Sequence, residues 1–212
     1  MYIPKHFAFD EPAEIQAFVR EFPFATLITT VDGVPLATHL PLMLDMRVGA
    51  HGMLRGHVAR ANPHWKAFEN NAAESLAIFH GPHTYISPRW YAAGPAVPTW
   101  NYVAVHMYGR PQILTSTDDL LADLGAMVEV FEPDGQADHI ITPEYKERLA
   151  AGIVGFRMEI TWVEGKRKLS QNKSADDQAG VAAGLALAED PDATVYRDYL
   201  ATKNWLSNTS NN

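Results

Sequence analysis

The chain has 212 residues, with 17 Lys and Arg against 25 Asp and Glu, so its formal net charge is −8 when the histidines are neutral. The absence of cysteine excludes a disulfide-stabilised scaffold, a thiolate nucleophile and zinc sites built on cysteine. The acidic excess disfavours direct DNA binding, because Lys and Arg make the contacts to phosphate groups.

Asp10, Glu11 and Glu14 interrupt the N-terminal segment, where a secretory signal would need an apolar stretch. No later segment approaches the roughly 20 apolar residues that a membrane-spanning helix needs. We therefore predict a cytoplasmic protein without membrane association.

A helix followed by a hairpin is predicted for the first part of the chain. Apolar residues recur at helical spacing over residues 10–22, which is typical of an amphipathic helix. Asp32-Gly33 is a strong hairpin signal and separates two apolar, β-branched segments, residues 24–31 and 34–44. A third strand is predicted over residues 51–58.

The middle of the chain continues the β pattern after one helix. Asn62 followed by Pro63 predicts a helix that starts there and reaches about residue 70. Three further strands are predicted over residues 75–79, 84–87 and 99–108. Gly81-Pro82 predicts a turn between the first two of them.

Helices and one long strand follow. Ser116 precedes an acidic segment, which predicts a helix that ends near residue 131, and Thr142-Pro143 predicts the start of another. A strand is predicted over residues 154–164.

The C-terminal part is predicted to be a helical extension, about residues 174–205. Ser174 and Asp177 have the spacing of a capping box, and the helix is expected to end before Asp190-Pro191. Residues 206–212 are polar and predicted to form a disordered tail.

Together these elements predict an α+β fold in one domain, residues 1–205, with an antiparallel sheet that curls or closes. A parallel doubly wound sheet is disfavoured, because the early strands are joined by hairpin-length turns that are too short for crossovers.

The sequence contains little that indicates a metal site or the nucleophile of a serine hydrolase. None of the nine histidines has the His-x-x-x-His spacing of a helical zinc site, and Gly-Pro separates the closest pair, His80 and His83. The chain has no Gly-x-Ser-x-Gly motif. We therefore predict no metal site and no serine nucleophile.

Residues 54–65 combine a predicted strand end, Gly56, two arginines and a Pro-started helix. Guanidinium groups and the N–H groups of a helix N-terminus suit a phosphate monoester. Arg55 and Arg60 are therefore phosphate candidates. The alternative is that both are surface cations and that Asn62 only caps the helix.

Two other segments carry polar and aromatic side chains. Residues 81–108 are rich in Tyr and Trp, which suits a flat heteroaromatic ligand, an oligomer interface or the core of a barrel. Residues 165–173 join a basic run to Ser, Gln and Asn. This run is either a solvated face or a binding segment for a phosphate-bearing ligand.

Six groups of motifs occur in order along nearly the whole chain: Met1-Tyr-x-Pro4; Thr38-His-Leu-Pro41; Leu54-Arg-Gly-His57 with Ala61-Asn-Pro-His-Trp65; Gly81-Pro-His-Thr-Tyr-Ile-Ser-Pro88; Val97-Pro-Thr-Trp-Asn-Tyr102 with Val105-His106; and Lys168-Leu-Ser-Gln-Asn-Lys173. In this order they resemble the PaiB family, described as FMN-binding negative transcriptional regulators and related to pyridoxine-phosphate-oxidase-like split barrels. Each motif alone is weak, whereas the ordered set is specific.

The resemblance implies a homodimer of split β-barrels with flanking helices and with FMN at the subunit interface. The implied phosphate contacts are Arg55, His57, Arg60 and Asn62, with His39 on the neighbouring strand. The implied ring contacts, from either subunit, are Thr99, Trp100 and Asn101. The last implied cofactor contacts are Lys168, Gln171 and Asn172.

The function implied by the resemblance is that of a flavin-dependent regulator or sensor. The chain is acidic and has no helix-turn-helix pattern, so a small ligand or a protein partner is as compatible with regulation as DNA contact. The alternative is an FMN-dependent oxidoreductase, a flavin reductase or an oxidase-like enzyme, in which His39, His57 and Tyr85 are acid/base candidates. A haem-binding split barrel with a histidine ligand is the third possibility.

Overall fold

The structure, a computed structural model, describes residues 1–69, 74–92, 94–135, 140, 142–203 and 205. The predicted tail, residues 206–212, lies outside the described residues. No helix in the described ranges has the length and apolar character needed to cross a bilayer.

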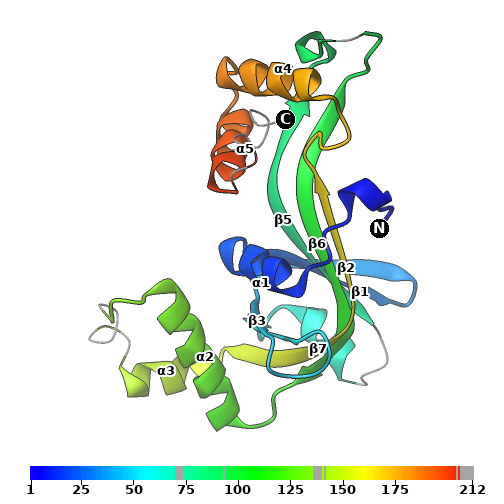
Figure 1. The fold of residues 1–212 in the computed structure, drawn as a ribbon. Helices are drawn as coiled ribbons and strands as arrows, with labels where there is room; N and C mark the ends of the chain where they lie inside the picture. Colours follow the sequence, from blue (N-terminus) through cyan, green and yellow to red (C-terminus); the bar gives the residue numbers. More distant parts are fainter. Residues whose placement is uncertain (70–73, 93, 136–139, 141, 204, 206–212) are drawn as a thin grey trace. The chain divides into compact units, whose positions relative to one another are not determined.

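Seven strands form one antiparallel sheet with helices beside it (Figure 1). The strands are β1 Phe24–Val31, β2 Val34–Pro41, β3 Met43–Asp45, β4 Met53–Ala59, β5 Ser75–Ile86, β6 Thr99–Ile113 and β7 Ile153–Lys168. Their order in the sheet is β2-β1-β5-β6-β7-β4-β3. The predicted α+β class with an antiparallel sheet is confirmed.

The helices comprise five α-helices and three short 3₁₀ helices within the described ranges. They are η1 Lys5–Phe7, α1 Pro12–Glu21, η2 Pro63–Phe68, η3 Pro88–Trp90, α2 Thr117–Phe131, α3 Pro143–Ala150, α4 Ala175–Ala186 and α5 Pro191–Thr202.

The chain divides into two compact units. Unit 1 comprises Met1–Asp10, His80–Val105 and Glu164–Asn212, and unit 2 comprises Glu11–Phe79 and His106–Val163. Strands β5, β6 and β7 each contribute residues to both units.

The β1–β2 hairpin of unit 2 turns where the sequence predicts. Asp32 and Gly33 have φ values of 51° and 80°, the left-handed values of a two-residue hairpin turn, which glycine adopts without steric cost. The turn pairs Val31 with Val34. On its other side β1 pairs with β5, which anchors the hairpin in the sheet.

Strand β4 pairs with β3 on one side and with β7 on the other, antiparallel to both. Its residues alternate between two faces. Leu54, Gly56 and Val58 are buried on one face, while Arg55 and His57 are half-buried on the other. Two of the predicted phosphate ligands therefore share one face of β4.

In unit 1, helices α4 and α5 pack against each other. Ser174 accepts a hydrogen bond from the Asp177 N–H at 3.2 Å, as the capping box predicts, and Asp190 accepts from the Asp192 N–H at 3.0 Å. The buried side chains of this region include Leu169, Val181, Leu185, Tyr196 and Leu200. Asp190-Pro191 thus opens a second helix as well as following the first.

The predicted turn at Gly81-Pro82 is wrong, because β5 runs through it from Ser75 to Ile86. Strand β1 pairs with β5 only as far as Phe79. The missing N–H of Pro82 therefore costs no hydrogen bond to β1, and the strand tolerates the proline as an edge strand would.

Other predicted boundaries also differ: β6 continues to Ile113, the segment predicted as one strand over residues 34–44 is β2 and the start of β3, and β4 covers Met53–Ala59. The helix that Asn62 caps is the 3₁₀ helix η2, which ends at Phe68 rather than near residue 70. Strand β7 is longer than predicted and starts at Ile153 and ends at Lys168. These differences lie at element ends, where local sequence patterns are least decisive.

Two glycines inside helices should respond oppositely to alanine. A Cβ at Gly184 of α4 would lie 2.3 Å from Cδ2 of Trp90, whereas a Cβ at Gly125 of α2 would have no heavy atom within 4 Å. Gly184→Ala should destabilise the protein by about 1–3 kcal/mol through overpacking. Gly125→Ala should stabilise it by about 0.5–1 kcal/mol, because alanine loses less backbone entropy. Urea unfolding measures both, and equal effects would contradict the packing of α4 on Trp90.

Candidate functional site

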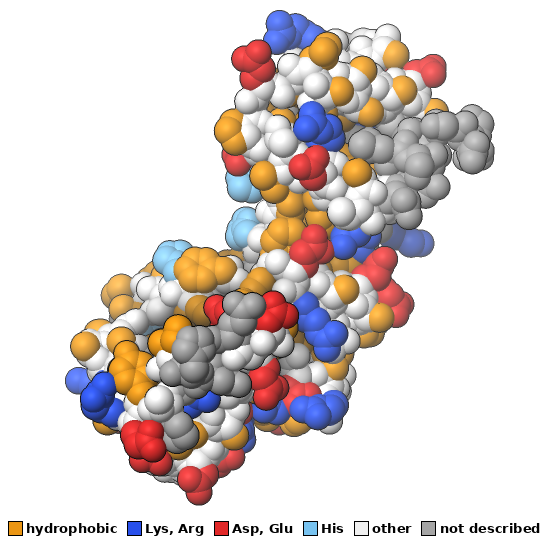
Figure 2. All heavy atoms as spheres, turned by 90° about the vertical axis from the view of Figure 1, so that its left-hand side faces the viewer, with side chains coloured by type: hydrophobic (Ala, Val, Ile, Leu, Met, Phe, Trp, Pro, Cys, Tyr) orange, Lys and Arg blue, Asp and Glu red, His pale blue; other side chains and the backbone are white. Residues whose placement is uncertain are grey.

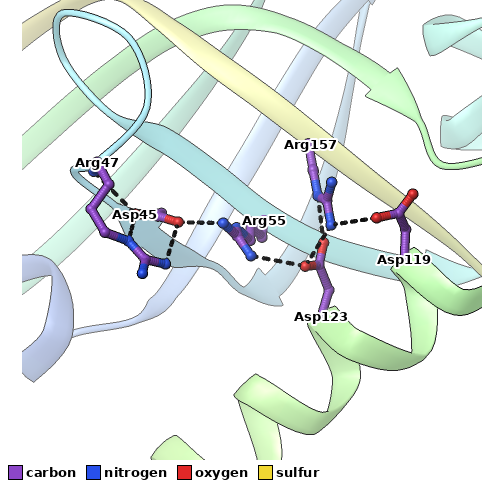
Figure 3. A network of polar contacts seen from close by, with 6 residues as sticks. All are labelled: Asp45, Arg47, Arg55, Asp119, Asp123 and Arg157. Carbon is purple, nitrogen blue, oxygen red and sulfur yellow. Dashed lines mark hydrogen bonds and ion pairs between the residues drawn. The ribbon is translucent and has the colours of Figure 1, made fainter.

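Arginines and aspartates alternate in a network that joins β3, β4, β7 and α2 in unit 2 (Figure 3). Asp123 is its centre, accepting hydrogen bonds from Arg55 at 3.0 Å and from Arg157 at 2.8 Å. Arg55 also donates to Asp45. The outer members are Arg47, 2.9 Å from Asp45, and Asp119, 3.3 Å from Arg157. Three cations face three anions, so the network is neutral as a whole.

The ion pairs of the network shift the pKa of Asp45 and of Arg157. The hydrogen bond from Arg47 holds the pKa of Asp45 well below its usual range, against the opposing effect of burial, and the charge of Arg55 adds to the lowering. The hydrogen bond to Asp123 is the main cause that raises the pKa of Arg157. Asp45 therefore stays ionised beside Arg55 at neutral and mildly acidic pH.

Helix α2 covers the face of β4 that carries Arg55 and His57. Both side chains line a small space that Leu120, Asp123 and Leu124 of α2 also line. Burial lowers the pKa of His57, so its imidazole is neutral at pH 7. Both side chains thus contribute to the packing of α2 on the sheet, and the cofactor role predicted for them stays a prediction.

Arg60 lies just beyond β4, and backbone carbonyls orient its side chain. Its Nε donates to the Ala151 carbonyl at 2.8 Å and its Nη2 to the Ile153 carbonyl at 2.9 Å. Its backbone N–H donates to Gly152 at 2.8 Å, and its carbonyl accepts from the Trp65 indole at 2.9 Å. Nη1 makes no hydrogen bond to any described residue, so its N–H groups can bind an anion at a defined position.

Asn62 joins the start of η2 to strand β2. Its Oδ1 accepts from the His64 N–H at 3.0 Å, and its Nδ2 donates to Thr38 Oγ1 at 3.1 Å. Thr38 Oγ1 lies 2.8 Å from His64 Nδ1. Burial lowers the pKa of His64, so its ring is neutral at pH 7, and the tautomer decides which of the two atoms in the contact with Thr38 donates.

Thr38 and His64 were not among the predicted site residues, although both lie in the quoted motifs. His64 is 2% exposed, and its Nε2 has no hydrogen-bond partner within the described part of the chain. The signal that could have found them is the polar type of both residues within otherwise apolar segments.

The structure separates His39 from this group. Adjacent residues of a strand point to opposite faces, so His39 lies across β2 from Thr38. Its Nδ1 is 3.0 Å from Thr26 Oγ1, and its ring stacks on Phe24 with centroids 6.5 Å apart. His39 and Phe24 are both exposed.

In unit 1 the structure brings four of the predicted cofactor residues together. Thr99, Asn101, Lys168 and Asn172 line one pocket of about 180 Å³. The Lys168 ammonium donates to Thr99 Oγ1. Asn101 is 1% exposed and donates through Nδ2 to Ser170 Oγ at 2.9 Å.

Trp100 and Gln171 lie apart from that pocket. Trp100 is 51% exposed on the opposite face of β6, with its ring centroid 6.0 Å from Tyr85 and 6.2 Å from His83. Gln171 closes its own loop, because its Oε1 accepts from the Leu169 N–H at 2.7 Å and its Nε2 donates to the Arg167 carbonyl. The structure therefore gives Gln171 a folding role.

A larger pocket of about 460 Å³ lies in unit 2 between α1, β3 and α2. Leu42, Met43 and Phe131 line it together with Arg20 and Arg47. The side of unit 2 that carries α2 and α3 shows hydrophobic side chains interspersed with acidic and basic ones (Figure 2). The described residues contain no group of three or more His, Asp or Glu placed to hold a metal ion.

Comparisons with known proteins agree on the kind of fold. A family model described as "Putative FMN-binding domain" matches residues 1–162. "Protease synthase and sporulation protein PAI 2" of Bacillus subtilis is 39% identical over 206 residues, which cover 96% of this chain and 98% of the relative.

Two solved flavoprotein structures are also similar. The flavocytochrome Anf3 of Azotobacter vinelandii aligns with a TM-score of 0.63 at 14% identity, covering 79% of this chain and 72% of that one. A FAD- and haem-binding protein of Mycobacterium smegmatis aligns with a TM-score of 0.59 at 18% identity, covering 83% of this chain and 79% of that one. At these identities the likeness shows the split-barrel fold alone.

Removal of the central carboxylate should destabilise unit 2. Asp123→Asn leaves Arg55 and Arg157 with one anionic partner fewer, and we expect a loss of about 2–4 kcal/mol, since breaking a mostly buried ion pair is costly. The matched control is Asp119→Asn, whose side chain is 50% exposed and whose loss should cost less than about 1 kcal/mol. Urea unfolding compares the two variants, and equal losses would show that Asp123 is not the centre.

Proposed function

This chain belongs to the FMN-binding split-barrel family that includes PAI 2, and from that premise we propose that it acts as a homodimeric, flavin-dependent regulator or sensor. The observation that carries the proposal is Arg60, whose side chain is oriented by the carbonyls of Ala151 and Ile153. The family model spans this residue. A cation held this way is ready to bind a cofactor phosphate.

The residues at the end of β4 fit the FMN phosphate. Arg60 Nη1 offers N–H groups to an oxyanion, and a guanidinium bonds phosphate oxygens more strongly than a neutral donor does. Asn62 holds the start of η2 against β2 through Thr38, which keeps Arg60 and η2 in one arrangement. We build this site without Arg55 and His57, because α2 covers them and Arg55 already binds two carboxylates.

The isoalloxazine ring needs a flat, partly apolar surface. Trp100, Tyr85 and His83 provide one in unit 1, since Trp100 and Tyr85 are 51% and 41% exposed. In the proposed homodimer, the second subunit presents this surface to the FMN whose phosphate the first subunit binds. His39 and Phe24 of unit 2 are further exposed ring contacts. FMN, when bound, supplies redox chemistry, and the protein supplies position and exclusion of water.

We propose the regulatory role because of the name of the Bacillus subtilis relative, and not because of a DNA-binding feature of this chain. PAI 2 carries protease synthesis and sporulation in its name. The formal charge of −8 opposes contact with DNA phosphates, so we propose that a small ligand or a protein partner transmits the flavin signal. A cytoplasmic location stays a prediction from the sequence.

The absorption spectrum of the protein purified without added cofactor tests the proposal. Flavin bands, and release of FMN on denaturation, are expected together with elution at the size of a dimer. A Soret band would instead indicate the haem chemistry carried by the flavocytochrome and by the M. smegmatis protein. A colourless monomer that takes up neither cofactor would overturn the proposal.

Arg60→Ala should weaken FMN binding by about 1.5–3 kcal/mol, because it removes a charge-assisted hydrogen bond to phosphate. Arg110→Ala, an exposed arginine of β6 in the same unit, is the matched control and should leave affinity unchanged. Riboflavin, which lacks the phosphate, should bind the wild type and Arg60→Ala equally. Flavin fluorescence quenching measures each affinity, and equal FMN binding by both variants would clear Arg60 of this role.

A further inference from the structure

The pocket of unit 1 has a composition unlike that of the rest of this acidic chain. It lies beside the ends of β6 and β7 and is lined by Phe7, Tyr91, Val97, Thr99, Asn101, Lys168, Ser170, Asn172 and Lys173. Two of these residues are cationic and none is a carboxylate. We name this set the lysine pocket.

Neither lysine of the pocket has a carboxylate partner. Within the described residues no Asp or Glu oxygen lies within 4.0 Å of the ammonium of Lys168 or Lys173. Burial lowers the pKa of Lys168, and the charges of Lys166 and Lys173 lower it further. Cations brought this close repel one another, and an anion between them would remove the repulsion.

The turn after β7 brings these two cations together. The Lys173 N–H donates to the Ser170 carbonyl at 3.0 Å, and Ser170 adopts a left-handed φ of 68°, which is uncommon for a residue other than glycine. Lys168 is fixed by its bond to Thr99, and the Lys173 ammonium lies 4.7 Å from the centroid of the Tyr91 ring. Both cations are therefore oriented, as a binding site requires.

A buried polar atom of the pocket also lacks a partner. The Nδ2 group of Asn101 donates to Ser170 and to the Tyr196 hydroxyl, at 2.9 and 3.1 Å. Its Oδ1 is buried and accepts no hydrogen bond from any described residue. An acceptor left without a donor in the interior costs free energy. This atom is closed off from solvent, so it belongs to the wall of the pocket and is not a contact for a ligand inside it.

The pocket is too small to enclose FMN. Sites for drug-sized ligands occupy about 300–1,000 Å³, whereas this one has about 180 Å³. Lys168, Ser170, Asn172 and Lys173 also lie beyond residue 162, where the match to the FMN-binding family model ends. The volume therefore suits a group of the size of a phosphate rather than a whole FMN molecule.

We propose that the lysine pocket binds the phosphate group of a small metabolite other than FMN, with Lys168 and Lys173 as its charge partners. The hydroxyl of Thr99 and the side chain of Asn172 complete the polar lining. Four of the predicted cofactor residues, Thr99, Asn101, Lys168 and Asn172, thus belong to this proposed phosphate site. Phosphate binding there does not depend on FMN being bound.

Isothermal titration calorimetry tests this site: inorganic phosphate is titrated into the full-length protein at constant ionic strength. We expect saturable binding by the wild type and about tenfold or greater weakening in Lys168→Met and in Lys173→Met, since each removes a charge-assisted bond. Lys66→Met, an exposed lysine of η2 in unit 2, is the control and should bind as the wild type does. Sodium acetate is the second probe, and a carboxylate should bind more weakly than phosphate.

Three outcomes would overturn the proposal. Equal phosphate binding by all variants would mean that the pocket does not bind it, and tighter acetate binding would assign the site to carboxylates. FMN titration of the same variants should give wild-type affinity; a matching loss of FMN affinity would show that the pocket belongs to the flavin site. Lys173→Met guards against a folding defect, because Lys173 is exposed. Failure to bind FMN at all would contradict only the proposed function, since phosphate binding is measured separately.

Discussion

A charge withdrawn from water must find an opposite charge, and in unit 2 this requirement acts through Asp123. Its carboxylate binds Arg55 of β4 and Arg157 of β7 at once, so α2 can pack on the sheet only where these two strands lie side by side. The ion network and the apolar side chains around it therefore select the same position for α2. That position covers the face of β4 that carries Arg55, whereas Arg60, beyond the end of the strand, keeps N–H groups for a ligand.

Strand β7 is the element on which both candidate sites depend. At its start, the Ile153 carbonyl orients Arg60, and at its end Lys168 enters the lysine pocket. The two sites use different chemistry. Arg60 offers a fork of N–H groups that backbone carbonyls hold in place. The lysine pocket relies on two ammonium groups without carboxylate partners, whose mutual repulsion an anion would relieve.

Several elements could be predicted because their signals are local. The Asp32-Gly33 turn needs left-handed φ values that few other residue pairs adopt easily, and Ser116 and Ser174 cap helices three residues from the N–H groups they bind. Pro82 was misread, because whether a proline breaks a strand depends on the neighbour strand. Here β1 ends its pairing with β5 before Pro82, and that is a property of the sheet.

By itself, the sequence determined the antiparallel α+β class, the order of the elements and the residue types available for binding phosphate. Composition, the spacing of apolar residues and the residues at turns are signals that act over a few residues. The ordered motifs showed, in addition, the resemblance to a family. Only the tertiary structure decided which cations are available. Arg55 and Arg60 look alike in the sequence, five residues apart, yet Arg55 meets Asp45 and Asp123, 10 and 68 residues from it along the chain, while Arg60 meets backbone carbonyls. The partner of a charge depends on contacts between distant segments, and those contacts exist only once the sheet and α2 have packed together.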